Sequence, residues 1–340
     1  MTKASNGTIL ELKDLRKHFI IKQSFLTRLL TRRKSLCVQA VSETNLRVSK
    51  KQTIGLVGES GCGKTTLGRT ILKLHKPTSG KIFYEGVDVT DISGKDLKGY
   101  HRRVQMIFQN PYASLNPRKT IGDIVGTPLK NRGIKEYSRR TEISYDLLDR
   151  VGLSRRHYHL YPHQFSGGQR QRIGIARALA MQPEFIVADE PVSALDVSVQ
   201  AQIINLLEEL RDEFELTYLF ISHDLSVIYY ISDLVAVMYL GRIVEMAPTD
   251  ELFNHPLHPY TRALMSAIPV IDKSSRRKRI ILEGTVPSPI DPPAGCRFHP
   301  RCNRMDGEPC RQRKPVWQEA APNHWIACHL FGGKNQEEDG

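Results

Sequence analysis

Residues 53–65, TIGLVGESGCGKT, constrain the fold of this chain more than any other stretch. TIGLV has the apolar, β-branched pattern of a buried strand, and a helical pattern follows the loop through about Leu74. Gly58 to Thr65 fit G-x-x-x-x-G-K-[ST] between that strand and that helix, which is the context that a phosphate-binding loop requires. Glycines let backbone N–H groups turn toward phosphates, and the helix N-terminus adds positive potential. The stretch therefore predicts a nucleotide site on an α/β scaffold.

Each loop position has an expected role. Lys64 should reach the β- and γ-phosphate oxygens, and the Thr65 hydroxyl should ligate Mg²⁺. Cys62 occupies a variable position of the loop, so we interpret it as a bystander rather than a redox control. The residues expected to contact ATP are Gly58, Glu59, Ser60, Gly61, Cys62, Gly63, Lys64, Thr65 and Thr66.

Strand and helix patterns alternate along the rest of the chain. Strands are predicted at 8–13, 36–48, 81–84, 104–108, 185–189, 217–221, 234–239 and 242–246. Helices are predicted near 138–151, 168–181, 199–214 and 258–267. This alternation is typical of an α/β domain with a largely parallel sheet, and 340 residues suffice for such a domain plus an appendage.

FIVADE, residues 185–190, carries an acidic pair at the end of a predicted strand. Asp189 suits Mg²⁺, directly or through water, and Glu190 is placed to polarise an attacking water as a general base. An Asp-Glu pair by itself is more often a solvated turn. In a chain with a phosphate loop it indicates a hydrolytic site.

FSGGQRQRIGIARAL, residues 165–179, is the most specific stretch. Ser166 is a predicted helix cap, and the glycines that follow expose unpaired N–H groups suited to an anion. Here the chain resembles the ATP-binding cassette (ABC) family of transporter ATPases, over about residues 8–270. The family's usual Leu is replaced by Phe165, which we expect to pack while the signature residues Ser166, Gly167, Gly168 and Gln169 bind nucleotide in trans.

The same resemblance implies further site residues. Phe19 matches the aromatic that stacks on adenine, and Gln109 matches the Q-loop glutamine that touches Mg²⁺ and water. Ser193 and Asp196 match the D-loop, and His223 matches the switch histidine that contacts the γ-phosphate. The implied catalytic set is Glu190, His223, Gln109 and Lys64, with Thr65, Gln109 and Asp189 at Mg²⁺.

The implied fold is a P-loop NTPase core of the ABC type, with a mostly parallel sheet, an antiparallel β subdomain and a helical signature subdomain. A composition change at Ser274 and the proline-rich VPSPIDPPAG predict a linker into a small cysteine module. The expected boundaries are a nucleotide-binding domain at 1–270 with a helical subdomain at about 110–182, a linker at 271–292, the module at 293–330, and a disordered tail at 331–340.

Four of the six cysteines fall in the last third of the chain, at Cys296, Cys302, Cys310 and Cys328. A module this small needs a cross-link or a bound metal to be stable. The spacing lacks the C-x₂-C knuckles of zinc modules and also misses the common ferredoxin run. From the residues alone, an iron–sulfur cluster, structural zinc and free thiols remain open.

NHPLHPYTRALMSAIP (254–269) and GCRFHPRC (295–302) closely resemble the C-terminal region of oligopeptide and dipeptide importer ATPases, particularly the second ATPase subunit of dipeptide systems. That resemblance favours a [4Fe–4S] cluster on the four cysteines, with zinc as the alternative. It also implies ATP-driven import of di- or oligopeptides. Related ATPases serve importers of nickel or another small solute, and a non-transport ABC ATPase is the third alternative.

In this family each complete ATP site joins the phosphate loop of one subunit to the signature stretch of another. This chain has one copy of each, so it supplies half of each of two sites. The resemblance therefore implies a dimer, with a related but different ATPase chain as the partner, on two membrane permease subunits served by a solute-binding protein. The chain should be a peripheral protein on the cytoplasmic face of the cell membrane. Its charge of +13 is scattered and accompanies no nucleic-acid motif, so no nucleic-acid partner is expected. Residues 24–34 are either a basic amphipathic membrane segment or a packed loop.

Overall fold

The computed structural model describes residues 7–21, 36–268 and 279–331. The segment 24–34 and the residues 332–340 of the expected tail lie outside these ranges. The chain forms two compact units. Of the described residues, the first consists of 7–9, 48–53 and 84–222, and the second consists of 10–21, 36–47, 54–83, 223–268 and 279–331.

The first unit is built on three adjacent parallel strands. They are β6 (Val104–Ile107), β7 (Phe185–Asp189) and β8 (Thr217–Ile221). Every residue of β7 and β8 is buried, which explains their continuous apolar runs. Two helices lie between strands in sequence as crossovers do, α3 (Gly94–Arg103) before β6 and α8 (Val197–Phe214) between β7 and β8. The short β5 (Val87–Asp88) also belongs to this unit.

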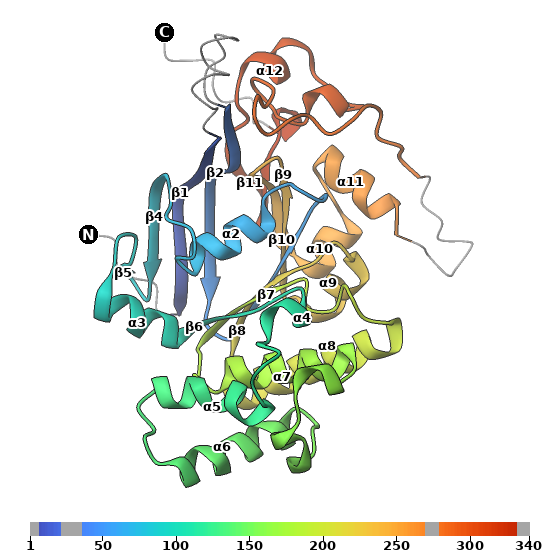
Figure 1. Ribbon diagram of the computed structural model, residues 1–340. Coiled ribbons are helices and arrows are strands. Elements are labelled where there is room, and N and C mark those ends of the chain that lie inside the picture. The colour runs from blue at the N-terminus through green and yellow to red at the C-terminus, as the bar shows by residue number, and fades with distance from the viewer. Residues whose placement is uncertain (1–6, 22–35, 269–278, 332–340) are drawn as a thin grey trace, which may run out of the picture. The chain divides into compact units, whose positions relative to one another are not determined.

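A helical group is inserted between β6 and β7 of this unit (Figure 1). It contains α4 (Pro111–Ser114), α5 (Ile121–Asn131), α6 (Tyr137–Arg150), two 3₁₀ turns (Arg155–His159 and Pro162–Gln164) and α7 (Gly167–Leu179). No sequence pattern predicted α5, because Gly122, Gly126 and Pro128 all oppose a helix. Packing stabilises it instead, since Gly122 leaves room for the Tyr158 ring, which a Cβ there would meet at 2.3 Å.

The second unit contains the strand that leads into the phosphate loop. This strand, β3 (Thr53–Val57), pairs in parallel with β9 (Leu234–Tyr239), and β10 (Arg242–Pro248) pairs antiparallel with β9. The helices of the unit are α2 (Lys64–Ile71), α9 (Leu225–Ile231), α10 (Thr249–Asn254) and α11 (Pro259–Ser266). The predicted arrangement of parallel strands and intervening helices is confirmed.

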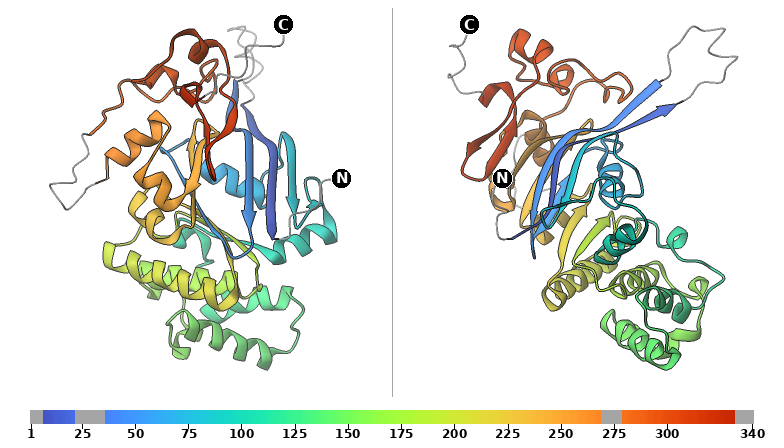
Figure 2. Two further views of the ribbon diagram at one scale, coloured as in Figure 1. Left: turned by 180° about the vertical axis from the view of Figure 1, so that it is seen from behind. Right: turned by 90° about the vertical axis from the view of Figure 1, so that its left-hand side faces the viewer.

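A second sheet supplies the β subdomain. Its strands β2 (Leu36–Ser49), β1 (Thr8–Ile21) and β4 (Ser79–Tyr84) are neighbours in that order. Figure 2 shows the long strands β1 and β2 running side by side. Strand β1 carries fully buried leucines such as Leu12 and Leu15, so this sheet contributes to the apolar core of the second unit.

The C-terminal module joins the edge of the sheet in the second unit. It contains the 3₁₀ turn His299–Arg301, α12 (Gly307–Gln312), β11 (Trp317–Ala321), β12 (His324–Ala327) and a last 3₁₀ turn at His329–Phe331. Strand β12 pairs antiparallel with β10, and β11 pairs with β12 (Figure 2). Neither strand was predicted, because their sequence is short, polar and interrupted by Pro322.

A buried carboxylate fixes this attachment. Glu245 of β10 has no exposed surface and accepts hydrogen bonds from the backbone N–H groups of Leu257 (2.6 Å) and His258 (3.0 Å). Nε2 of the equally buried His324, in β12, lies 2.7 Å from the same carboxylate. Buried carboxylates are stable only when their oxygens are paired, so Glu245 ties α11 and the module to one strand.

No helix within the described ranges combines the length and apolar character needed to cross a membrane.

Candidate nucleotide-binding site

The phosphate loop, residues 58–63, connects β3 to α2 in the second unit. Gly58 and Gly63 have positive φ angles of 151° and 111°. A Cβ at Gly58 would lie 2.1 Å from the Met238 carbonyl oxygen, and one at Gly63 would lie 2.0 Å from the Ala40 carbonyl oxygen. Glycine is thus required at both positions by conformation and by space. The loop follows its strand and opens its helix as the sequence predicts.

Lys64 begins α2 and is almost completely buried under the loop. Its Nζ donates to the carbonyl oxygens of Gly58 (2.6 Å) and Glu59 (3.1 Å), so the ammonium group lies inside the ring of the loop backbone. Thr65 and Thr66 follow in the first turn of α2 and are half-buried. Cys62 is buried as well, and burial raises the pKa of its thiol, which therefore stays protonated at neutral pH.

Phe19 lies near the end of β1 and is half-buried rather than part of the core. Its ring meets the His75 ring edge-on with centroids 5.3 Å apart, and the Lys17 ammonium lies 4.8 Å from its centroid. A partly exposed aromatic ring of this kind could stack on a base.

Asp189 ends β7 in the first unit, and Glu190 follows it directly. Asp189 is 2% exposed. Glu190 has a positive φ of 46°, an unfavourable conformation for a non-glycine residue that is often found at functional sites. Nε2 of Gln109 donates to the Glu190 carboxylate at 2.8 Å, and the Ser193 hydroxyl donates to the Glu190 carbonyl oxygen at 3.1 Å. Three residues predicted as separate motifs thus meet at one point.

The signature stretch has the predicted helix cap. The Ser166 hydroxyl accepts from the backbone N–H of Gln169 at 3.3 Å, and the Gln169 side chain accepts from the Ser166 N–H at 3.0 Å, forming a capping box. A Cβ at Gly168 would lie 2.4 Å from the Val199 side chain, so α7 and α8 pack closely there. Phe165 is buried, whereas Ser166 is exposed at the surface of the first unit.

The other predicted residues lie at element ends. Asp196 is exposed and precedes α8, next to Val197, which is 81% exposed. His223 is exposed and follows β8, and the carboxylate of its neighbour Asp224 caps α9 by accepting from the Ser226 N–H at 2.8 Å. Such exposed turns at strand and helix ends are where nucleotide contacts are placed in α/β proteins.

All six cysteines are free thiols. In the described ranges, which include Cys296, Cys302, Cys310 and Cys328, no group of three or more His, Cys, Asp or Glu side chains is placed to hold a metal ion. The structure therefore does not support the expected metal site of the module, whether iron–sulfur or zinc. Burial raises the pKa of Cys296 to about 11 and of Cys328 to about 12, so a cation bound there would have to displace the thiol protons.

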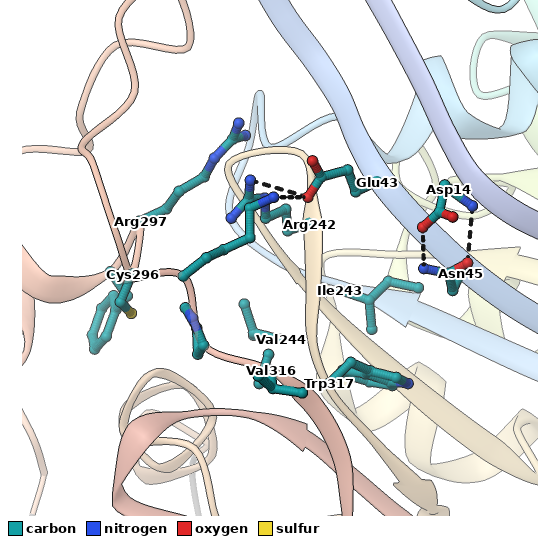
Figure 3. Close-up of a pocket in the computed structure, with 14 residues that line it drawn as sticks. Asp14, Glu43, Asn45, Arg242, Ile243, Val244, Cys296, Arg297, Val316 and Trp317 are labelled. Atoms are coloured by element: carbon teal, nitrogen blue, oxygen red, sulfur yellow. Dashed lines mark hydrogen bonds and ion pairs between the residues drawn. The ribbon is translucent and has the colours of Figure 1, made fainter. Parts of the chain in front are cut away.

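Residues of the module and of the β subdomain together line a pocket of about 280 Å³, shown in Figure 3. Cys296 and Trp317 of the module are among them. Glu43 of β2 lies at this pocket and is surrounded by cations, accepting from Arg16 at 2.6 Å, from Arg242 at 3.3 Å and from Lys314. Although burial opposes it, the hydrogen bond from Lys314 and these positive charges lower the pKa of the Glu43 carboxyl. The role of Glu43 could not be predicted from sequence, since nothing local marks a carboxylate whose partners lie this far away along the chain.

Two family models match the chain. Residues 41–193 match the ABC transporter family, and residues 244–310 match the oligopeptide/dipeptide transporter C-terminal region. The matched ranges contain the phosphate loop, the signature stretch and three of the four module cysteines.

Similar proteins cover nearly the whole chain. The oligopeptide transport ATP-binding protein AppF of Bacillus subtilis is 52% identical over 97% of this chain and 100% of its own length. A probable peptide ABC transporter ATP-binding protein of Sinorhizobium fredii, y4tS, is 47% identical over 96% and 90% of the two chains.

Among solved structures, the ATP-binding cassette MJ0796, in a dimeric post-hydrolysis state bound to ADP and Pi, has a TM-score of 0.62 and 27% identity. It covers 71% of this chain and 99% of its own. The chain therefore belongs to the ABC transporter ATPases. Within them it carries the C-terminal region of oligopeptide and dipeptide transporters.

The glycine requirement of the loop predicts the effect of one methyl group. Gly63→Ala should weaken ATP binding at least about tenfold, because the methyl group displaces the backbone that cradles the phosphates and also strains φ. The measurement is titration of the purified chain with a fluorescent ATP analogue. Gly99→Ala is the matched control, since a Cβ at Gly99 of α3 meets nothing within 4 Å. Equal affinities of the two variants would contradict the assigned role of Gly63.

Proposed function

We propose that this chain is the ATP-hydrolysing subunit of an importer of di- and oligopeptides, working on the cytoplasmic face of the cell membrane. The observation that carries the proposal is the likeness to an oligopeptide transport ATP-binding protein along the whole chain, C-terminal region included. As a peripheral subunit, the chain would act through two permease subunits and a solute-binding protein.

Phosphate binding falls to the loop and the first turn of α2. Lys64 binds the β- and γ-phosphate oxygens once its Nζ leaves the loop carbonyls, and the Thr65 hydroxyl holds the metal ion. Asp189 and Gln109 would be further partners of Mg²⁺, which would neutralise phosphate charge when bound with ATP. Phe19 stacks on the adenine ring.

Hydrolysis falls to Glu190. Its carboxylate takes the proton of the attacking water, and Gln109, which already donates to that carboxylate, orients both the base and the water. His223 contacts the γ-phosphate. The support for these assignments is the hydrogen bond between Gln109 and Glu190 and the strained backbone of Glu190 at the end of a buried strand.

Two chains make the working unit. The exposed Ser166 and the N–H groups of Gly167 and Gly168 bind the γ-phosphate of ATP held by the other chain, and Ser193 and Asp196 lie at that interface. We propose a heterodimer with a related ATPase. ATP binding closes the pair and phosphate release reopens it, so that nucleotide state moves the permease.

Replacing the proposed general base Glu190 should stop ATP hydrolysis without stopping ATP binding. Glu190→Gln should lower the ATPase kcat by a hundredfold or more, roughly the contribution of a positioned base, while ATP still binds and still drives dimerisation. Phosphate release and size-exclusion chromatography with ATP measure the two effects. Glu142→Gln, an exposed position on α6, is the control. Full turnover in Glu190→Gln would eliminate this carboxylate as the base.

The cargo is tested in the assembled transporter. In liposomes containing the permease, the partner ATPase and the solute-binding protein, di- or oligopeptides should stimulate ATP hydrolysis several-fold, because a cargo-loaded binding protein favours the closed ATPase pair. Nickel ions and free amino acids are the comparison cargoes. Stimulation by nickel alone would assign the chain to a different importer.

For the C-terminal module we propose a [4Fe–4S] cluster on Cys296, Cys302, Cys310 and Cys328. Its support is the resemblance of the module to the C-terminal region of oligopeptide and dipeptide transporters, whose family model matches residues 244–310. About four iron and four sulfide per anaerobically purified chain are expected, falling in Cys328→Ser and unchanged in Cys37→Ser. Zinc without sulfide, or no metal, would refute the cluster.

A further inference from the structure

The phosphate loop carries a negative charge that is neutralised from the far end of the chain. Glu59, the second residue of the loop, forms a two-pronged ion pair with Arg301 of the C-terminal module. Arg301 Nη1 lies 2.8 Å from Oε2 of Glu59, and Nη2 lies 3.1 Å from Oε1. The Arg301 side chain is 8% exposed and that of Glu59 is 26% exposed. Parallel pairing of this kind is among the strongest and most directional contacts of arginine.

Arg301 is held rigidly in place. It ends the 3₁₀ turn His299–Arg301, one residue before Cys302. The neighbouring Phe298 is 1% exposed, and its ring lies 5.2 Å from the Tyr239 ring and 5.4 Å from the Tyr260 ring, measured between centroids. Arg297 is buried too and donates to Gln39 at 2.6 Å and to Ser42 at 3.1 Å. The turn that carries Arg301 is therefore held in place by buried neighbours, which fix the position of its guanidinium group.

The backbone of Glu59 is fixed by the same region. Its N–H donates to the hydroxyl oxygen of Tyr260 at 2.9 Å, and Tyr260, in α11, is completely buried. Side chain and main chain of this loop residue thus both depend on residues that follow His258. The C-terminal part of the chain therefore helps to hold the shape of the phosphate loop.

A carboxylate in a loop that binds a triphosphate is electrostatically unfavourable. Like charges this close repel strongly in a partly buried site, where screening by solvent and salt is weak. An arginine in contact with the carboxylate cancels that repulsion. Because no other cation pairs with Glu59 among the ion pairs found in the described ranges, the compensation depends on Arg301.

We propose that Arg301 is a positioning residue for ATP, which neutralises Glu59 and thereby makes the C-terminal module part of the nucleotide site. The proposal rests on the ATP-binding function proposed above. It assigns the module a direct role in ATP affinity, separate from any role of its cysteines, and it makes that affinity sensitive to any event that loosens the 3₁₀ turn at 299–301.

The test compares three variants of the full chain, with Kd for a fluorescent ATP analogue in Mg²⁺ as the readout and KM and kcat for ATP beside it. Arg301→Gln should raise Kd and KM roughly tenfold with a smaller change in kcat, because the uncompensated carboxylate repels the phosphates. Glu59→Gln should lower Kd severalfold, since it leaves an unopposed cation. Glu59→Gln/Arg301→Gln should return to within about threefold of the original chain.

The opposite signs distinguish charge compensation from simple support of the fold. Both single variants lose the ion pair and both should unfold at lower temperature, so a purely structural pair would weaken ATP binding in both and the double variant would not recover. That result, or unchanged Kd in Arg301→Gln, would overturn the proposal. Arg301→Lys keeps the positive charge but cannot form the two-pronged contact with Glu59. Its Kd should therefore lie between that of Arg301→Gln and that of the original chain.

Arg311→Gln, at an exposed position of α12, is the control for the loss of one positive charge from the module. Its Kd should match that of the original chain. If the original chain itself bound no ATP, the proposed function would fail; normal binding there with no effect of Arg301→Gln would reject only this inference.

Discussion

The close approach of backbone to backbone at the phosphate loop is the constraint on which the second unit depends. Carbonyl oxygens of β9 and β2 occupy the space where side chains at Gly58 and Gly63 would lie. The Gly241 N–H also donates to the Cys62 carbonyl oxygen at 2.7 Å, which joins the loop to the turn between β9 and β10. The loop that leads into α2 is therefore shaped by the backbone of β2, of β9 and of the β9–β10 turn.

The same packing explains why the C-terminal module needs less internal support than its size suggests. A segment of some 35 residues is too small to bury a core alone, which motivated the expectation of a metal staple. In the structure it shares the core of the second unit through the β12–β10 pairing, the ring cluster around Phe298 and the buried Glu245–His324 contact. Such contacts supply stability that an isolated module would have to obtain from a metal.

Local chemistry made several predictions accurate. Ser166 was predicted as a cap because a serine before a helix can accept from a first-turn N–H without distant partners. The structure has that cap and adds a capping box with Gln169. The buried strand β7 was predicted from its apolar run and ends in Asp189, as expected. By contrast α5 was missed, since its glycines and proline oppose a helix and only packing against Tyr158 and its neighbours retains it.

The sequence by itself determined the class of the protein, because a phosphate loop between strand and helix and a capped signature helix are specified by residues a few positions apart. Tertiary structure decided which side chains meet: Gln109 with Glu190 across 81 positions, His324 with Glu245 across 79, and Arg301 with Glu59 across 242. Each of these pairs joins charged or polar groups with no periodicity to reveal them. Their partners are selected by burial and by the geometry of the folded backbone, which exist only once the chain has packed.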